Sequence, residues 1–127
     1  MPFDWNRYLT LAEELATRAD EASKRSAISR AYYCVFNLAF ARAQSTAGPR
    51  PSGEHRHKWC WTKYRNGPDP FCIQLGVDGD RMHGRRVKAD YNPADIPRLN
   101  DEVERMLEDA REFLADLARL HSRYPLP

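Results

Sequence analysis

The sequence predicts an all-α protein that folds as an up-and-down bundle of four main helices and one short helix. Three observations indicate this class. Apolar residues recur at three- and four-residue steps in the first and last segments, a long central segment is apolar on nearly every side, and no segment has the character of a strand. The chain of 127 residues is long enough to bury a core of its own, so we expect a single domain over residues 1–127.

Two helices are expected in the first third of the chain. The apolar residues between Trp5 and Ala19 form one stripe, which predicts an amphipathic helix over about residues 5–21. The polar stretch ASKRS that follows is expected to be a brief joint. Residues 26–43, SAISRAYYCVFNLAFARA, have scarcely a polar residue from Ala31 to Ala41. A helix that is apolar on nearly every side is a buried one, so we expect this segment at the centre of the bundle.

Three more helical segments follow, and the first two are bounded by breaks. The stretches STAGPRPSG (45–53) and RNGPDP (65–70) end helices through their prolines and glycines. Between them, EHRHKWCWTKY predicts a short helix. Residues 71–91 predict a longer helix whose first part is prone to irregularity because glycines weaken it. The clearest pattern is the last, where an apolar stripe from Leu99 to Leu120 predicts an amphipathic helix.

Composition and charge indicate where the protein acts and what it binds. No apolar run is long enough to span a bilayer, and the first residues lack the features of a signal peptide, so we expect a soluble cytoplasmic protein without membrane association. The net charge is only +2, but residues 50–88 hold nine Lys and Arg against four Asp and Glu, a local excess of five. This basic region either binds an anion such as a phosphate or is a solvated surface balanced by an acidic helix.

Several residues of metal-ligating type also lie in or near this region. They are His55, His57, Cys60, Cys72 and His83. They lack the paired CxxC or HxxxH spacing of a zinc site, so we interpret the cysteines as packed residues and the histidines as exposed or capping groups. We therefore predict no metal and no cofactor. A nucleophile motif and a phosphate-binding glycine loop are also missing from the sequence.

The stretch GRRVKADYNP, residues 84–93, contains the main candidates for a binding site. On a helix, Arg86 and Asp90 share a face. They form either a simple surface ion pair or a site in which Asp90 orients the guanidinium toward a phosphate, with the hydroxyl of Tyr91 nearby. From the residues alone the surface ion pair is the favoured interpretation. Arg85 and Lys88 add positive charge to the same stretch.

The segment SAISRAYYCVFNLAFARA, the histidine that opens GEHRHKWCW, and the R-x-x-A-D-Y at 86–91 together resemble the HEPN domain. The closest likeness is to the stand-alone short HEPN proteins of bacteria and archaea, and it covers about residues 4–120. This resemblance implies a helical bundle that forms a homodimer with a cleft between its protomers. Many HEPN proteins resemble metal-independent ribonucleases used as toxins or in phage defence. Others bind nucleotides or pair with a nucleotidyltransferase in a toxin–antitoxin module.

The resemblance also implies roles for individual residues. Arg86 takes the position of the arginine that stabilises the scissile phosphate, and Tyr91 takes that of the histidine that moves a proton. Because tyrosine has an ordinary pKa of about 10, it is a poor proton shuttle near neutral pH, and the motif is degenerate. His55 matches the histidine that opens the third helix and remains a candidate acid or base. Arg30 matches the SRAYY motif, where it either anchors the helix or contributes to the site.

We therefore expect a HEPN-family protein of the toxin or defence type that binds RNA or nucleotide through the basic region. Endoribonuclease activity without a metal is a further hypothesis, which the degenerate motif weakens. The alternative is a non-catalytic helical module for dimerisation or protein interaction, for example as the partner of a nucleotidyltransferase or an antitoxin. In that alternative, Arg86 and Asp90 form only a structural pair.

Overall fold

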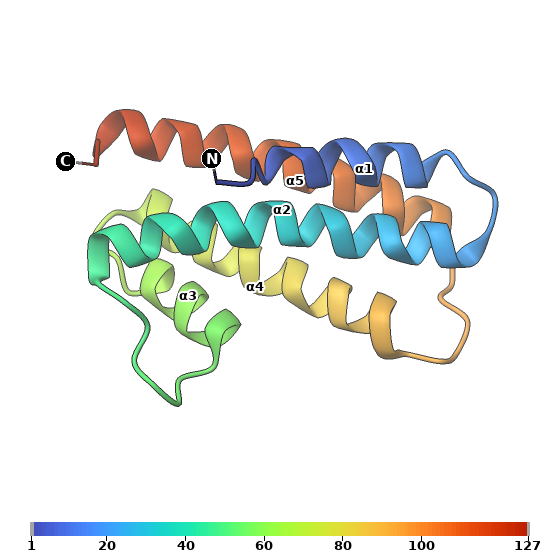
Figure 1. The fold of residues 1–127 in the computed structure, drawn as a ribbon, viewed down its shortest axis with the longest axis horizontal. Coiled ribbons are helices and arrows are strands. Elements are labelled where there is room, and N and C mark those ends of the chain that lie inside the picture. The colour runs from blue at the N-terminus through green and yellow to red at the C-terminus, as the bar shows by residue number, and fades with distance from the viewer. Residues whose placement is uncertain (1, 127) are drawn as a thin grey trace.

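The computed structural model describes residues 2–126, and within that range the chain forms five α-helices and no strand (Figure 1). The helices are α1 (Asn6–Ala16), α2 (Glu21–Ala47), α3 (Arg56–Arg65), α4 (Pro70–Tyr91) and α5 (Leu99–Arg123). The predicted all-α class and the five helical segments are confirmed. Over residues 2–126, no helix has both the length and the apolar character that a membrane span requires.

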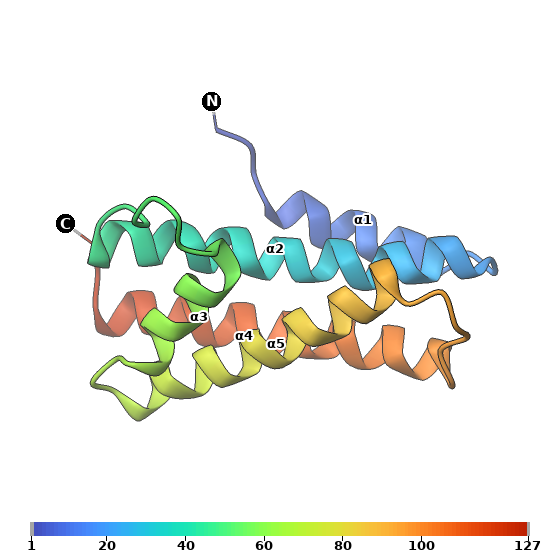
Figure 2. The ribbon, with the colours of Figure 1, turned by 90° about the horizontal axis from the view of Figure 1, so that it is seen from below.

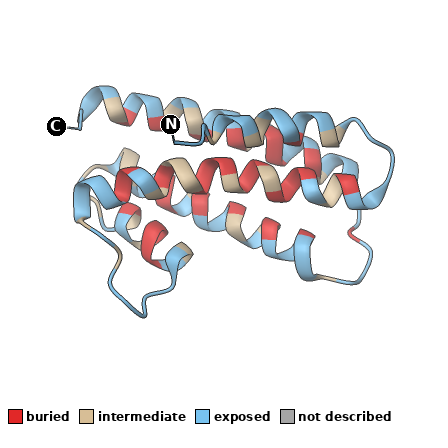
Figure 3. Ribbon diagram, in the orientation of Figure 1, coloured by how far each residue is buried: buried red, intermediate tan, exposed pale blue. Residues whose placement is uncertain are grey.

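Helix α2 lies at the centre of the bundle. It packs against α1, α3, α4 and α5, and the four longer helices alternate in direction while α3 crosses one end (Figures 1 and 2). Buried residues occur around much of the circumference of α2, from Ser23 to Ala43 (Figure 3). The prediction that residues 26–43 form the central buried helix is therefore confirmed.

The joint between α1 and α2 lies earlier in the chain than the sequence predicted. Helix α1 ends at Ala16 rather than near residue 21, and α2 begins at Glu21. The ASKRS stretch, expected to be a joint, is therefore part of α2. The physical reason is Asp20, whose backbone is extended and whose Oδ2 accepts the N–H of Ser23 at 3.0 Å, so that it caps the helix.

Helix α4 is continuous from Pro70 to Tyr91, although its first part was expected to be prone to irregularity. Two of its glycines explain why. A Cβ at Gly79 would come within 2.4 Å of the indole of Trp61, and one at Gly76 would come within 2.7 Å of the backbone nitrogen of Arg65. The absence of side chains at both positions lets α3 pack closely on α4, and this packing outweighs the weak helix propensity of glycine.

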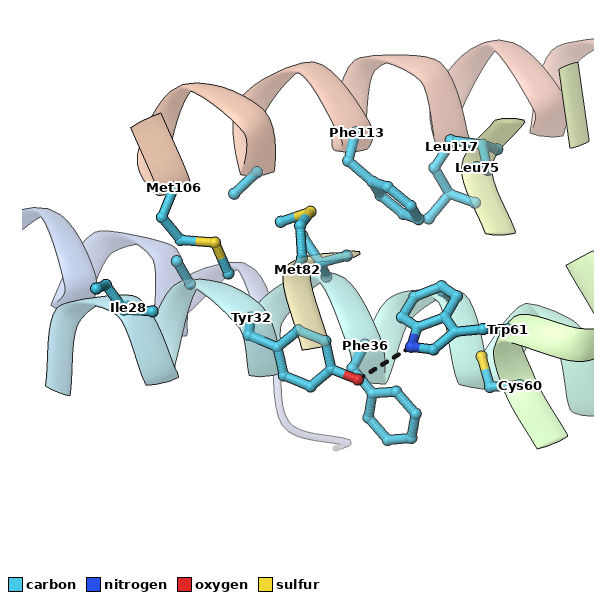
Figure 4. Packing of buried hydrophobic residues seen from close by; sticks show 14 of the residues in the cluster. Ile28, Tyr32, Phe36, Cys60, Trp61, Leu75, Met82, Met106, Phe113 and Leu117 are labelled. Carbon is cyan, nitrogen blue, oxygen red and sulfur yellow. Dashed lines mark hydrogen bonds between the residues drawn. The ribbon is translucent and has the colours of Figure 1, made fainter. Parts of the chain in front are cut away.

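The hydrophobic core fills the space between α5 and the other helices (Figure 4). Phe113 of α5 packs edge-on against Trp61, with ring centres 5.8 Å apart. The indole N–H of Trp61 donates to the hydroxyl oxygen of Tyr32 at 3.1 Å, so these polar groups are paired inside the core. The largest fully buried side chains include Trp61, Tyr32, Phe36, Leu75, Met82 and Met106.

The C-terminal end of α4 is held against α2 by Arg25. Its Nη1 donates to the carbonyl oxygens of Ala89 at 3.1 Å and Asn92 at 2.6 Å, and its Nη2 donates to that of Ala94 at 2.7 Å. These carbonyls lie in and just beyond the last turn of α4, where the helix offers no further N–H groups. Arg25 therefore fixes residues 84–93, the stretch that contains the candidate site, against the central helix.

Candidate functional site

Arg86 is a buried arginine on α4, with only 9% of its surface exposed. Its Nε donates to Oδ2 of Asp90 at 2.9 Å, and the same oxygen accepts the hydroxyl of Ser29 on α2 at 3.0 Å. Its Nη2 lies 3.4 Å from the hydroxyl oxygen of Tyr91. The Arg86–Asp90 pair expected from the sequence is thus present. It differs from an ordinary surface pair because Arg86 is buried and Asp90, although exposed, is tied to a second helix.

The guanidinium of Arg86 also lies against two tyrosine rings. Its Cζ is 5.0 Å from the ring centre of Tyr33 and 5.4 Å from that of Tyr91. The Cζ of Arg30 lies 5.2 Å from the same Tyr33 ring and 4.8 Å from the ring of Tyr8. Rings and cations therefore alternate across α1, α2 and α4, in the order Tyr8, Arg30, Tyr33, Arg86 and Tyr91. We call these five residues the cation–aromatic row.

Two stacked histidines lie next to Arg86 in the fold. The rings of His57 on α3 and His83 on α4 have centres 4.6 Å apart and planes inclined by 14°. Nδ1 of His57 is 2.7 Å from the hydroxyl of Tyr32, which already accepts the indole N–H of Trp61. The proton of the Tyr32 hydroxyl is therefore directed at His57, which makes Nδ1 the acceptor and leaves the ring proton on Nε2.

Both histidines are neutral near pH 7. Burial is the largest cause that lowers the pKa of His57 to about 4, and repulsion from a proton on His83 and from the charge of Arg86 adds to it. Burial and Arg86 also lower the pKa of His83. Burial is the larger cause of both shifts, and the charge of Arg86 adds to each, so a proton on either ring is unfavourable.

Two of the residues singled out in the sequence, Arg85 and Lys88, lie apart from this arrangement, and a third, His55, lies at its edge. Arg85 points toward α5, where its Nη1 is 2.5 Å from Oδ2 of Asp109. Lys88 is exposed and lines a groove together with Arg85. His55 is exposed at the N-terminus of α3, with its ring centre 5.7 Å from that of His57. The predicted residues that the fold does bring together are Arg86, Asp90, Tyr91 and Arg30.

His57 and His83 are the site residues that sequence reasoning missed, since both were interpreted only as exposed or capping groups. A signal for His83 was present, because it precedes Arg86 by three residues and so shares its face of the helix. His57 precedes Trp61 by four residues, which places it one turn from a core residue. To predict that His57 rather than His55 belongs to the site, one must know at which residue α3 begins. Tertiary packing determines that residue.

The other residues of metal-ligating type are spread through the fold. Among residues 2–126, no three His, Cys, Asp or Glu side chains are grouped so that they could hold a metal ion. Cys34 and Cys60 are fully buried, and burial raises the pKa of their thiols to about 11 and about 12. They are packed residues, as the sequence predicted. Cys72 is half-buried.

The fold and the site together define an all-α bundle with an arginine–tyrosine–histidine cluster where α2, α3 and α4 meet. Comparison with protein-family models, curated proteins and solved structures finds no match. The chemical capacity of the cluster follows from its groups. A fixed guanidinium suits a phosphate, tyrosine rings suit a nucleobase, and imidazole nitrogens suit a hydroxyl.

Proposed function

We propose that this chain is a HEPN-type protein of the toxin or defence class that binds RNA or a nucleotide at the cation–aromatic row, with Arg86 contacting a phosphate. The observation that carries this proposal is the setting of the Arg86 guanidinium. It is buried and oriented by Asp90, yet among residues 2–126 its Nη1 donates to no protein group. A guanidinium fixed in this way keeps N–H donors for a phosphate oxygen.

The tyrosines of the row supply surfaces on which bases can stack. Tyr91 is 70% exposed, and its ring lies beside the guanidinium of Arg86. Tyr33 lies between Arg86 and Arg30, and Tyr8 continues the row onto α1. Unpaired bases stack on aromatic rings and on guanidinium planes, whereas the bases of a duplex are covered. The row therefore favours single-stranded RNA, and a free nucleotide would occupy only its Arg86 end.

The direct test is a titration of a labelled single-stranded RNA of about ten nucleotides, followed by fluorescence anisotropy. We expect Arg86→Gln to weaken binding by at least about tenfold, because a charged contact to phosphate is lost. Arg85→Gln is the matched control, since it removes the same charge from the neighbouring position that faces α5. Circular dichroism checks that both variants are folded, and a nucleotide competitor separates RNA binding from nucleotide binding.

Two results of this titration would contradict the proposal. Equal losses in the Arg86 and Arg85 variants would indicate non-specific attraction to a basic surface. Failure of the wild-type chain to bind either RNA or nucleotide would leave the non-catalytic interaction module as the better function. In that function, Arg86 and Asp90 serve only to tie α4 to α2 through Ser29.

A homodimer is part of the proposal, and the exposed face of α4 supports it. Ile73, Val77, Val87 and Tyr91 are exposed apolar side chains that fall on one stripe of the helix. A second copy packed on this stripe would cover apolar surface and border the Arg86 site, because Tyr91 belongs to both. The cytoplasmic location stays a prediction from the sequence, and pairing with an antitoxin or a nucleotidyltransferase is what the HEPN resemblance implies for such a dimer.

RNA cleavage without a metal is a second candidate activity, which the stacked histidines favour. Nδ1 of His57 is already bound by Tyr32, whereas His83 has no hydrogen bond to any group within residues 2–126. His83 would take the proton of a ribose 2′-hydroxyl, the 2′-oxygen would attack phosphorus, and water would protonate the departing 5′-oxygen. Arg86 would stabilise the charge on the phosphate.

Cleavage is tested on the same RNA in the presence of EDTA. We expect products with the wild-type chain and with His55→Ala, and none with Arg86→Ala or His83→Ala. If the wild-type chain binds RNA but leaves it intact, cleavage is rejected and binding is retained.

A further inference from the structure

A pocket of about 310 Å³ lies at the end of the bundle where α2, α3 and α5 end, next to the turn that joins α3 to α4. This end is separate from the Arg86 site. The pocket involves residue 42 near the end of α2 and residue 72 near the start of α4, whereas the site involves Arg30 earlier in α2 and Arg86 late in α4. Its volume is that of a compact small-molecule site.

The main polar feature of the pocket is Arg42, of whose surface only 7% is exposed. Its Nη1 lies 2.6 Å from Nδ1 of His121, and its Nη2 donates to the carbonyl oxygen of Tyr124 at 2.8 Å. Because Arg42 is the donor, Nδ1 of His121 is unprotonated. Burial and Arg42 lower the pKa of His121, so the ring is neutral. Both partners of the arginine are therefore uncharged.

No carboxylate within residues 2–126 lies at ion-pair distance from Arg42. Asp69 is the one carboxylate of the pocket wall that the structure describes, and its oxygens are already occupied. They accept the guanidinium of Arg123 at 2.9 Å, the hydroxyl of Tyr124 at 2.9 Å and the N–H of Phe71 at 2.8 Å. A buried charge without a counter-ion is unfavourable unless a ligand supplies one.

The remaining wall is mostly apolar and carries one more cation. Ala47 and Leu120 form apolar walls, Cys72 contributes a half-buried thiol, and Lys63 adds an exposed ammonium group at the side of α3. The pocket therefore combines an apolar interior with a positive charge that the protein does not neutralise. A ligand matched to it has an apolar body and a single anionic group.

From this arrangement we infer that the pocket binds a small organic carboxylate, whose carboxylate pairs with Arg42 while its apolar body fills the space bounded by Ala47, Cys72 and Leu120. The guanidinium has five N–H groups, and two of them are used by His121 and Tyr124. The remaining N–H groups are available to the carboxylate. The planar guanidinium matches the geometry of both carboxylates and phosphates. A phosphate is disfavoured here, because its larger charge would need a second cation beside Arg42, and Lys63 is exposed at the side of α3.

The test uses 2-naphthoate as the probe and 2-naphthylmethanol as its uncharged counterpart of similar shape, with binding measured by calorimetry. The wild-type chain should bind the acid at least about tenfold more tightly than the alcohol, because only the acid pairs with Arg42. The acid should also slow labelling of Cys72 by N-ethylmaleimide, as followed by mass spectrometry. Cys34 and Cys60 are fully buried, so their labelling does not obscure this signal.

Three variants locate the binding site. Arg42→Gln removes the charge, and Ala47→Phe fills the pocket from an exposed position without disturbing the core. Each substitution should weaken the binding of 2-naphthoate by at least about tenfold. Ala41→Phe is the matched control, because it makes the same substitution at an exposed position of α2 outside the pocket and should bind like the wild type.

The Ala47 variant keeps the test decisive if Arg42→Gln fails to fold. The inference is overturned if the wild-type chain does not bind 2-naphthoate, if acid and alcohol bind equally, or if Ala47→Phe binds as tightly as Ala41→Phe. None of these results bears on RNA binding, because Arg86 and the cation–aromatic row are unchanged in all three variants.

Discussion

The indole of Trp61 lies directly against Gly79, so close that a Cβ on this glycine would come within 2.4 Å of the ring. This contact sets the register between α3 and α4. His57 is four residues before Trp61 on one helix and His83 is four residues after Gly79 on the other, so each lies one turn from the contact. The stacking of the two histidines therefore follows from the packing of a tryptophan on a glycine.

Replacing Gly79 with alanine should destabilise the protein and disturb the histidine pair. The added methyl group overlaps a ring that is itself fully buried, so the helices must move apart at a cost of roughly 1–3 kcal/mol or more. Chemical denaturation measures the loss in the free energy of unfolding, and nuclear magnetic resonance signals of His57 and His83 should shift.

Gly84→Ala is the matched control for this prediction. It lies in the same helix, and a Cβ there meets nothing within 4 Å. Alanine should raise the stability by about 0.5–1 kcal/mol, because it has the better helix propensity. A Gly79 variant as stable as the Gly84 variant would show that α3 does not pack as closely as described.

The parts of the fold that local patterns encode were predictable from the sequence, as α5 and α2 illustrate. The spacing of the stripe from Leu99 to Leu120 predicts one buried face. The apolar run in residues 26–43 predicts a helix that is buried on most sides. The start of α2 was predicted wrongly, because polar residues after Asp20 are compatible with a helix once a cap is present. Two further features, the role of Gly79 and the choice of His57 over His55, depend on contacts between separate helices.

Arg85 and Arg86 also show what local sequence cannot predict, because they face different helices. The two residues are adjacent in a basic stretch, and the sequence suggested that both add to one binding surface. On a helix, adjacent residues are turned by about 100°, so Arg85 pairs with Asp109 on α5 while Arg86 faces α2. Which of the two joins the site depends on how α4 is rotated against its neighbours, and local sequence does not determine this rotation.

The hydroxyl of Tyr32 should contribute measurably to stability. It accepts the N–H of Trp61 and donates to His57, so Tyr32→Phe leaves a buried indole N–H without a partner. We expect a loss of about 1–3 kcal/mol in the free energy of unfolding, measured by urea denaturation.

Tyr33→Phe is the control for the Tyr32 variant. The hydroxyl of Tyr33 has no hydrogen bond within residues 2–126, and phenylalanine keeps the ring that faces Arg86 and Arg30. Its stability should match the wild type within about 0.5 kcal/mol. Equal losses in both variants would mean that ring packing, rather than the hydroxyl, is responsible.

A charge introduced on the exposed stripe of α4 should separate the proposed dimer into monomers. Val77→Glu places a charge on the exposed stripe, one turn from Ile73, and this charge would lose water if a second copy covered it. Light scattering should find the wild type as a dimer and the variant as a monomer at the same concentration. Leu11→Glu, an exposed apolar position on α1, should remain a dimer. A wild-type chain that stays monomeric up to high concentration would contradict this prediction.

The buried imidazole of His57 should make the protein less stable in mild acid. Its pKa is about 4 in the folded protein and about 6.5 when unfolded, so the unfolded chain binds the proton first as the pH falls. The contribution to stability is therefore complete above pH 6.5 and is lost progressively as the pH is lowered toward 4. Because the ring is only half-buried, solvent screening reduces the effect to the order of 1 kcal/mol between pH 7 and pH 5.

Urea denaturation of the wild type and of His57→Gln at several pH values checks this sign and size. Glutamine retains an acceptor for Tyr32 but cannot bind a proton, so the variant should lose less stability than the wild type as the pH falls. Part of the dependence will persist, because the pKa of His83 is also lowered and this residue is unchanged. Gly84→Ala alters stability without altering any titratable group, so its pH dependence should parallel that of the wild type. A His57→Gln variant with the full wild-type dependence would place the acid-sensitive group elsewhere.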